Sequence, residues 1–520
     1  MQILILIFIT ILLIGLLMIG NSMFIDRKDS DESYHLGLIG RIRKNKNKFI
    51  LGNDLHIGEE NFAYPQFYHW LISLMSHEFV KNKSTSINYF IQSVNIFLFL
   101  LFCTVYLSNI HTAYSTFLYL VLTGFFLFMV PFNFLSWNAK NTGLGPRQFS
   151  IFLTYLFLYF VYFNYIDSNF LYIILSTAVV FLILITSQFC FQFILFGSPL
   201  IAIFLKQWYI GLYPIIAGIL FSIIFPSISK KYFRGQFWHK YLYARFLADI
   251  YILKSRFSIW RDFIYDFWRI TISTKKIPLQ YISTNPIIEV LYSLPLFLIC
   301  TIYFVKNSVL FDKNHSFIFC ILATSLILFI ATSFRKTRFL GEPQRYIELS
   351  LPFCSIFFVS TFYDNTEIIL ALVFIYLILF FTILKNRNNS IPNCDKTDIN
   401  EILRTMENNS SKEIRLLCNN FNQAKYFMES QIKVFRPVYT SRDVLGIPFE
   451  KYHFKNHITL NSTFALRIYQ GFELNCFIHD KNLEGDYNEL IENQNLNLKL
   501  VSTINNFDIY TSETTYYEKE

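Results

Sequence analysis

Long stretches without charged residues alternate with short polar segments along most of the chain. Residues 3–20 are almost entirely apolar, and no Asp, Glu, Lys or Arg occurs between Lys83 and Lys140. Such windows are long enough for helices that cross a lipid bilayer. The first window is longer than the apolar part of a secretory signal, has no basic residues before it and has no small-residue cleavage site after it. We therefore expect it to be retained as a span.

The charge-free windows predict about eleven membrane-spanning helices. Turn-like breaks at residues 108–114 and 186–188 divide the two longest windows. The fold class is therefore an α-helical polytopic membrane protein. The expected spans are residues 2–24, 88–108, 112–134, 149–166, 170–187, 189–205, 208–225, 287–305, 315–334, 347–362 and 366–384.

Composition agrees with a membrane protein. The 520 residues are 53% hydrophobic and 16% charged, with 60 Phe and 33 Tyr, which excludes an ordinary soluble protein. The net charge of +9 suits an anionic membrane surface or a phosphate-bearing substrate, and no separate basic module indicates nucleic acid. The eight cysteines form no CxxC pair, so we interpret them as small buried apolar residues.

Three polar segments interrupt or follow the spans. Residues 25–87 form a first large loop, in which we expect short interfacial helices. Residues 226–286 mix eleven Lys and Arg with aromatic residues, a pattern equally consistent with helices in the headgroup layer and with a plain basic loop. From residue 386 the chain becomes polar, with short alternating stretches. This predicts a membrane domain over residues 1–385 and a small soluble α/β domain over residues 386–520.

Counting spans predicts that five segments lie on one side of the membrane: residues 25–87, 135–148, 226–286 and 335–346, and the tail, which two further spans separate from residues 335–346. Two spans separate residues 25–87 from the turn at 135–148, four more lead to residues 226–286, and two more lead to residues 335–346. An even number returns the chain to the same side each time. An error of one span within residues 149–225 would divide this set.

The first loop opens with the stretch DSDESYHLGLIGRIRKN (29–45), which predicts a helix capped by Ser30. Acids in the first turn suit the helix dipole, so a capped interfacial helix explains Asp31 and Glu32. At 100° per residue, Asp31 and His35 also share an otherwise apolar stripe. A carboxylate against an apolar surface tends to have a raised pKa and can act as a general base. These residues alone favour the capped helix.

Three further segments carry candidate chemistry. NFAYPQFYHWLISL (61–74) is an aromatic turn before a short amphipathic segment, and NTGLGPRQFS (141–150) holds one cation, Arg147, between two spans. RKTRFLGEPQRYIELSLPF (335–353) places several cations before a span. Turns, interface anchors and positive flanks explain all three. A cluster of Arg on the same side as an acid pair is also what a lipid-phosphate leaving group requires.

The order of these pieces resembles the GT-C superfamily of integral-membrane glycosyltransferases, which includes protein O-mannosyltransferases and the aminoarabinose transferases of lipid A. DESYH (31–35) and YPQFYHW (64–70) are similar to the DE-x-R-Y and KPPLYYW segments of the aminoarabinose-type branch, at a similar spacing. GEPQRY (341–346) resembles a late-loop motif of bacterial relatives. Tyr34-His35 replaces Arg-Tyr and Gln66 replaces the second proline of that pattern, so the sugar or the acceptor can differ. The resemblance covers the architecture and the first loop, and hardly touches the tail.

The resemblance implies inverting transfer of a sugar from a polyprenyl-phosphate donor to a lipid, glycan or protein acceptor. Asp31 would be the general base, and Glu32 would either take that role or orient the acceptor or a divalent metal. No other cofactor is implied. The implied substrate-binding residues are His35, Tyr64 and His69 in the acceptor cavity and Arg147, Arg338 and Arg345 at the lipid phosphate, with Glu342 in the same late loop.

Enzymes of this family work on the non-cytoplasmic face of the membrane. This implies an integral protein of a bacterial inner or plasma membrane with a periplasmic or extracellular active site. The nine Lys and Arg of residues 25–87 and the eleven of residues 226–286 predict the opposite by the positive-inside rule. Both segments are long enough for that rule to weaken, and a phosphate site needs cations of its own. We keep the non-cytoplasmic assignment.

Other function classes remain open. A transporter or flippase of lipid-linked glycans would be expected to carry ionisable residues inside its spans, and the spans within residues 88–225 offer none for a midplane path. A polysaccharide polymerase or ligase would be expected to use outer loops rich in Arg and His, and the early Asp-Glu pair argues against it. A non-catalytic assembly subunit is the remaining alternative.

Overall fold

The computed structural model describes most of the chain in ordered pieces. These are residues 2–22, 30–46, 65–108, 116–130, 144–242, 286–306, 313–334, 343–387, 396–409, 413–419, 426–430, 432–435, 474–481 and 487–512, with residues 49, 56–57, 133, 337, 340, 443–444, 447–448 and 469–470. The chain divides into two units. The helical unit comprises Met1–Arg27, Lys83–Pro226 and Ile252–Ser390, and the mixed unit comprises Lys28–Asn82, Ser227–Tyr251 and Ile391–Glu520.

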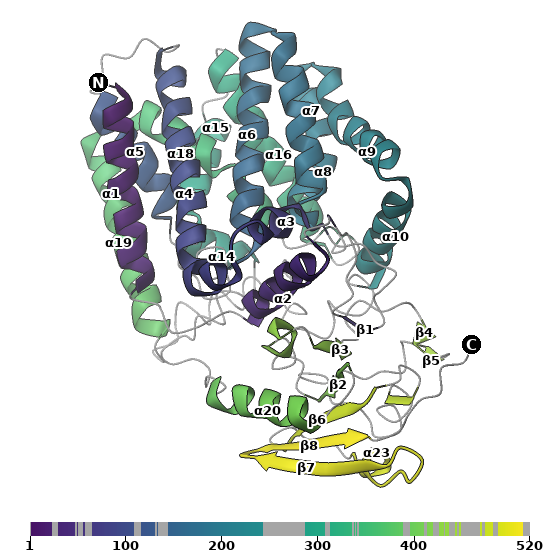
Figure 1. Ribbon diagram of the computed structural model, residues 1–520. Coiled ribbons are helices and arrows are strands. Elements are labelled where there is room, and N and C mark those ends of the chain that lie inside the picture. Colours follow the sequence, from purple (N-terminus) through teal and green to yellow (C-terminus); the bar gives the residue numbers. More distant parts are fainter. Residues whose placement is uncertain are drawn as a thin grey trace. The chain divides into compact units, whose positions relative to one another are not determined.

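The helical unit consists of helices that run largely side by side (Figure 1). Its helices are α1 (Gln2–Ser22), the greater part of α4 (His77–Ser108), α5 (Thr116–Phe128), α6 (Pro146–Asp167), α7 (Phe170–Leu184), α8 (Gln188–Leu205), η3 (Trp208–Leu212), α9 (Tyr213–Ile224), α14 (Pro286–Ser293), α15 (Pro295–Lys306), α16 (Lys313–Thr332), α17 (Gln344–Glu348), α18 (Leu351–Phe362) and α19 (Thr366–Arg387).

Helices occur at every predicted span, and they differ in length. Among the described residues, five helices are long and apolar enough to cross a membrane: Ile3–Gly20, His77–Leu107, Pro146–Asp167, Gln188–Leu205 and Lys313–Thr332. The apolar helices Phe117–Phe128, Phe170–Leu184, Trp208–Ile224, Pro295–Lys306, Leu351–Phe362 and Thr366–Phe381 are shorter. The chain is therefore mostly helical and fits a polytopic membrane protein, and the count of about eleven spans stays a prediction.

Local sequence explains where α6, α7 and α8 begin and end. Pro146 opens α6, and Ser168 ends it in the left-handed conformation with φ 53°. The Asn169 side chain then accepts a hydrogen bond from the Leu171 amide and caps α7. Ser187 caps α8 in the same way through the amide of Cys190. The predicted break at residues 186–188 is confirmed, because a capping side chain starts a new helix there.

Aromatic rings fill much of the core of the helical unit. The rings of Phe102 on α4 and Tyr159 on α6 stack with centroids 4.2 Å apart. Phe353 on α18 contacts both rings edge-on, so three helices distant in sequence meet at one point. Tyr162 adds a polar link, since its hydroxyl donates to Asn314 Oδ1 at 2.8 Å. Seven described cysteines are free and buried, as expected for small apolar residues.

Gly124 allows α5 to approach α1 closely, and it supports a test of this packing. A Cβ atom at Gly124 would overlap Leu13 Cδ1, whereas one at Gly15 on α1 meets nothing within 4 Å. We expect Gly124→Leu to lower the free energy of unfolding by about 1–3 kcal/mol, because an overfilled contact forces the helices apart. Gly124→Ala should cost less, since the Leu13 methyl can rotate away. Thermal unfolding of the detergent-solubilised chain measures this. Gly15→Leu is the matched control, and an equal loss in both leucine variants would contradict the prediction.

The mixed unit combines the first loop with the tail of the chain. It contains α2 (Ser30–Lys44), β1 (His56–Ile57), α3 (Phe67–Ser73), α20 (Lys396–Asn409), β2 (Arg415–Cys418), β3 (Lys433–Phe435), β6 (Cys476–Asp480), α23 (Asn488–Ile491), β7 (Leu498–Ile504) and β8 (Phe507–Ser512), with a separate pair β4 (Asp443–Val444) and β5 (Ile447–Pro448). Its six-stranded sheet has the order β1-β3-β2-β6-β8-β7. The helices α2 and α3 lie in the first loop, where short helices were expected.

The sheet joins distant parts of the sequence. β1 of the first loop runs parallel to β3 of the tail, with His56 opposite Val434. β7 and β8 form an antiparallel hairpin where the alternation in residues 499–512 predicted strands, and Asn505 at its turn has φ 50°. Tyr34 and Leu38 of α2 belong to the same buried cluster as Met406, Leu416 and Phe427 of the tail. The tail and the first loop therefore share one core.

The basic-aromatic segment begins as a helix. α10 (Pro226–Leu242) exposes Lys230, Lys231 and Arg234 together with the rings of Phe233 and Phe237. Exposed rings beside cations are typical of helices in the headgroup layer of a membrane. Of the two interpretations of residues 226–286, the helical one therefore holds for this first part. Residues 243–285 lie outside the described residues.

Candidate functional site

The predicted site residues that the structure describes fall into two groups, one in each unit. Glu32, His35 and His69 lie in the mixed unit, and Arg147 and Arg345 lie in the helical unit. The remaining predicted residues are described in part or not at all. Asp31 lies in the first turn of α2, but its side chain is outside the described part, as are Tyr64, Arg338 and Glu342.

The two histidines are brought together across helices α2 and α3. His35 Nδ1 and His69 Nε2 are 2.8 Å apart and share a hydrogen bond, in which one imidazole donates and the other accepts. Their ring centroids are 5.0 Å apart. His69 is fully buried and His35 is half-buried, so the pair leads from the protein surface into the unit. The sequence placed both residues in one cavity, and the structure places them in direct contact.

Glu32 is a buried carboxylate one helical turn before His35. Its side chain is 3% exposed, and its Oε1 makes no hydrogen bond to any described residue. Burial raises the pKa of the Tyr68 hydroxyl on α3, and the nearby charge of Glu32 raises it further. Glu32 of α2 and Tyr68 of α3 therefore share one environment of low polarity, where a buried oxygen without a hydrogen bond is energetically costly.

Burial lowers the pKa of His69 well below that of an exposed histidine, and His35 beside it lowers it further. An unfolded chain would take up a proton at His69 below about pH 6.5, whereas the folded protein does not. The stability that the folded protein has with a neutral His69 is fully present above pH 6.5. It is lost, by at most about 1.4 kcal/mol per pH unit, as the pH falls from 6.5 toward the folded pKa.

We therefore expect the temperature of unfolding to drop between pH 7.5 and pH 5 more steeply in the native protein than in His69→Gln. Unfolding of the solubilised full chain, followed at several pH values, measures the difference. His315→Gln, which removes a half-buried imidazole elsewhere, should keep the native pH dependence. Equal slopes for His69→Gln and the native protein would show that His69 does not have this environment.

Arg43 fastens the end of α2 to the end of α3. Its Nε donates to the Ser73 carbonyl at 3.1 Å, and its guanidinium also contacts the Met75 carbonyl and His77 Nδ1. Carbonyls at a helix C-terminus have no partner within the helix, so a cation there satisfies them and suits the dipole. Arg43 thereby fixes the angle between the two helices that carry Glu32 and the histidine pair.

Glu429 of the tail is a positioning residue that the sequence did not reveal. Ser33 Oγ of α2 donates to Glu429 Oε2 at 3.3 Å, and Lys81 Nζ lies 2.9 Å from Glu429 Oε1. Glu429 therefore ties the residue after Glu32 to the beginning of α4. No local pattern distinguishes Glu429 from other acids of the tail, because its partners lie several hundred positions earlier in the chain.

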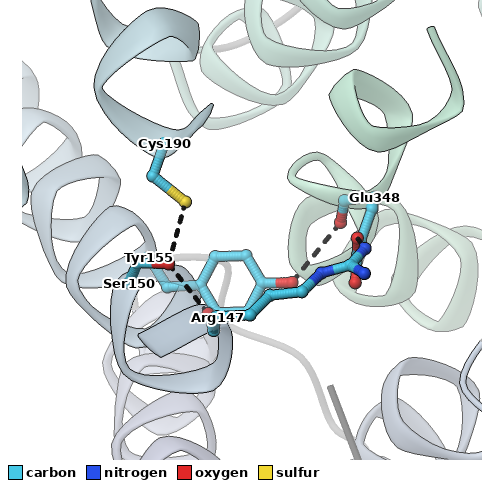
Figure 2. A network of polar contacts seen from close by, with 5 residues as sticks. All are labelled: Arg147, Ser150, Tyr155, Cys190 and Glu348. Atoms are coloured by element: carbon cyan, nitrogen blue, oxygen red, sulfur yellow. Dashed lines mark hydrogen bonds and ion pairs between the residues drawn. The ribbon is translucent and has the colours of Figure 1, made fainter. Parts of the chain in front are cut away.

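A second group of polar contacts lies inside the helical unit. Arg147 Nη2 at the start of α6 is 3.0 Å from Glu348 Oε2 at the end of α17, and the Glu348 side chain is almost fully buried. Figure 2 shows Arg147 and Tyr155 both reaching from α6 to Glu348, where the Tyr155 hydroxyl contacts the backbone carbonyl at 3.4 Å. Ser150 Oγ donates to the Arg147 carbonyl and accepts a contact from Cys190 Sγ.

This network changes the expected role of Arg147. The buried carboxylate of Glu348 neutralises the charge of Arg147, so Arg147 is not an isolated cation available to bind a phosphate. The Arg345 guanidinium lies 5.6 Å from the centre of the Phe189 ring in a cation–π arrangement. Glu348 was missed in the sequence. The signal was present, since a lone acid within the apolar run YIELSLPF needs a partner.

A divalent metal needs several converging ligands. Within the described ranges, no three His, Cys, Asp or Glu side chains lie together as ligands. Glu32 offers one oxygen, and the nitrogens of His35 and His69 that face each other are already hydrogen-bonded. These side chains do not form a metal site by themselves, and the chemistry proposed below uses the acids and imidazoles of the chain.

The arrangement of these helices and strands is similar to that of a known crystal structure. The crystal structure of the Archaeoglobus fulgidus oligosaccharyltransferase in complex with zinc and sulfate matches with a TM-score of 0.55. The match covers 92% of this chain and 68% of that chain. The chain has the fold of this oligosaccharyltransferase. At 12% identity the similarity establishes the fold and not the substrate.

The shared fold agrees with the helical membrane architecture that the sequence predicts, and it does not distinguish a family or an activity. No protein-family model matches the chain. No curated protein matches its sequence either.

Proposed function

We propose that the chain is a membrane glycosyltransferase. It transfers a sugar from a polyprenyl-phosphate-linked donor to a hydroxyl or amine of a lipid, glycan or protein acceptor, on the non-cytoplasmic face of a bacterial inner or plasma membrane. The observation that carries this proposal is the oligosaccharyltransferase fold over 92% of the chain. The acid pair at the start of α2 supplies the residue types that such a transfer needs.

The proposed reaction is a single displacement. Asp31, or Glu32 in its place, removes the proton of the acceptor as the acceptor atom attacks the anomeric carbon. The bond between that carbon and the phosphate oxygen breaks, and the electron pair leaves with the polyprenyl phosphate. The proton stays on the carboxylate and passes to water afterwards. The configuration at the anomeric carbon is inverted, because one attack occurs from the face opposite the leaving group.

Burial of Glu32 supports a direct part in this step. Its Oε1 makes no hydrogen bond to any described residue, so it can accept one from the hydroxyl or amine of an acceptor. His35 and His69 hold each other in one orientation, which suits them to align an acceptor beside the acid. Tyr64 would complete the same cavity.

Negative charge develops on the phosphate as the sugar leaves, and cations must lie near it. Arg345 and Arg338 are the proposed holders of the phosphate, with Glu342 of the same loop orienting them. Arg147 would contribute only together with Glu348, since the two are paired.

Transfer from a radiolabelled polyprenyl-phosphate sugar to endogenous acceptors in membrane vesicles tests the function. We expect labelled product only in vesicles that contain the protein. Movement of the intact lipid-linked sugar across the bilayer without transfer would overturn the proposal in favour of a flippase. A reporter fused after residue 60 tests the membrane side, and a cytoplasmic reporter would overturn the assignment of the site to the outer face.

A further inference from the structure

Helix α10 presents an exposed face that no step of the proposed reaction uses. Five exposed side chains share this face: Lys230, Lys231, Phe233, Arg234 and Phe237. On the other side of the helix, Ser229 is 5% exposed and Tyr232 is 1% exposed. One face of α10 is therefore covered by protein, and the other face is directed outward.

The exposed side chains are arranged in order across this face. At about 100° per residue, Phe233 and Phe237 lie within about 40° of each other at one edge. Lys230 and Arg234 follow on the neighbouring strip, and Lys231 lies beyond them. The rings form one column and the cations form the next. A helix at a membrane surface has this arrangement, because its rings enter the acyl-chain boundary while its cations stay among the headgroups.

No acid nearby in the sequence balances these cations. Between Asp167 and Asp249 the chain contains no Asp or Glu at all. Lys230 and Arg234 are four residues apart on one helix, a spacing at which like charges repel each other. An anion between them removes this repulsion, and a phosphate accepts hydrogen bonds from both an ammonium and a guanidinium. The face is therefore complementary in charge to phosphate groups.

The chain enters α10 directly from an apolar helix. α9 ends at Ile224, and α10 begins at Pro226. The outward side chains of α9 recur every four residues, as expected for a helix that faces hydrocarbon: Ile215, Ile219 and Ile223. Lys230 is only six residues after Ile224. If residues 208–225 span the bilayer as predicted, the covalent chain keeps the first cations of α10 close to the lipid headgroups.

We propose that the exposed face of α10 binds anionic phospholipids of the bilayer. Lys230, Lys231 and Arg234 contact the lipid phosphates, and Phe233 and Phe237 lie among the acyl chains. The partner is an abundant bilayer lipid rather than the polyprenyl-phosphate donor, because an exposed helix face is convex, whereas a site that selects one ligand is concave. This inference does not depend on the glycosyltransferase proposal.

Photo-cross-linking from the helix itself tests the inference. The full chain with Phe237→benzoylphenylalanine is reconstituted in vesicles of equal parts phosphatidylglycerol and phosphatidylcholine. We expect cross-links to phosphatidylglycerol to exceed those to phosphatidylcholine about fivefold or more, since one cation near an anionic surface contributes about that factor. Phe374→benzoylphenylalanine on α19 is the matched control, because the Phe374 ring is 64% exposed. It should give cross-links in the ratio of the bulk lipids.

Neutralising the cations should abolish the preference. The test variant changes all three together: Lys230→Gln, Lys231→Gln and Arg234→Gln. Its control neutralises three exposed cations outside α10 and should keep the preference: Lys206→Gln, Lys306→Gln and Lys313→Gln. Salt provides a second measurement in case the test variant fails to fold. Raising the ionic strength from about 0.1 M to about 1 M shortens the screening length from about 10 Å to about 3 Å and should lower the preference.

Three results would overturn the inference: cross-links in the bulk ratio when the cations are intact, cross-links to protein alone, and a preference that survives both neutralisation and high salt. A preference that a trace of polyprenyl phosphate removes would assign the face to the donor and would also overturn it. A clear preference in a chain that transfers no sugar would support the lipid-binding face and contradict only the glycosyltransferase proposal.

Discussion

Replacing Asp31 by Asn is expected to lower sugar transfer by about a hundredfold to ten-thousandfold, the usual contribution of a positioned general base. Asn keeps the size of the side chain and its capacity to start α2, but it cannot accept the proton of the acceptor. The loss should lie in kcat more than in KM, since a base acts in the transition state. Initial rates of transfer from a labelled donor, with protein amounts matched in the membrane, measure the effect.

Two further variants separate the roles within the acid pair. Asp29→Asn removes a charge two residues earlier and should leave transfer unchanged. Glu32→Gln should reduce transfer less than Asp31→Asn if Glu32 only orients the acceptor. The reverse order would move the base to Glu32, whose Oε1 is buried without a hydrogen bond from the described residues. Full activity of both Asp31→Asn and Glu32→Gln at normal expression would show that this acid pair is not the catalytic site.

Glu348→Leu is expected to be the most destabilising single substitution in the helical unit. It leaves the Arg147 guanidinium without its carboxylate in a mostly buried position, and breaking a buried ion pair costs about 3–5 kcal/mol. Because the Arg147 side chain remains 23% exposed, we expect a value at the lower end of that range. Thermal unfolding of the detergent-solubilised chain measures the loss.

A double-mutant cycle shows whether the loss comes from the pair. The double variant Arg147→Met with Glu348→Leu removes both charges and should recover part of the stability lost in Glu348→Leu. Glu367→Leu, which replaces an exposed acid in the first turn of α19, is the control and should change stability little. Additive losses in the double variant would contradict the coupling of Arg147 with Glu348.

The membrane helices were largely predictable because their determinants are local. Apolar windows require helices that satisfy their own backbone in a bilayer, and residues such as Pro146, Asn169 and Ser187 mark where helices begin. The strands β7 and β8 were predictable for the same reason, because the alternation of residues that indicates them is also local. The windows did not fix the number of spans, because length and apolarity identify five helices clearly and leave the shorter ones open.

The candidate site was predicted only in part. The sequence and its family resemblance selected the acids of α2, and they placed His35 and His69 in one cavity. They treated Arg147 as a cation for phosphate, whereas the structure pairs it with Glu348, 201 positions away.

The sequence by itself determined which segments are helical and apolar, where many of them begin, and which residue types are present for acid–base and phosphate chemistry. Only the tertiary structure decided which polar groups meet. In the tertiary structure β1 pairs with the sheet of the tail, and Ser33 and Lys81 both contact Glu429. Arg147 forms an ion pair with Glu348. The physical reason is range: helix periodicity and capping depend on neighbours within about four residues. The partner of a buried charge or amide depends on which distant segments pack together, because a group removed from water must be satisfied by whatever lies beside it.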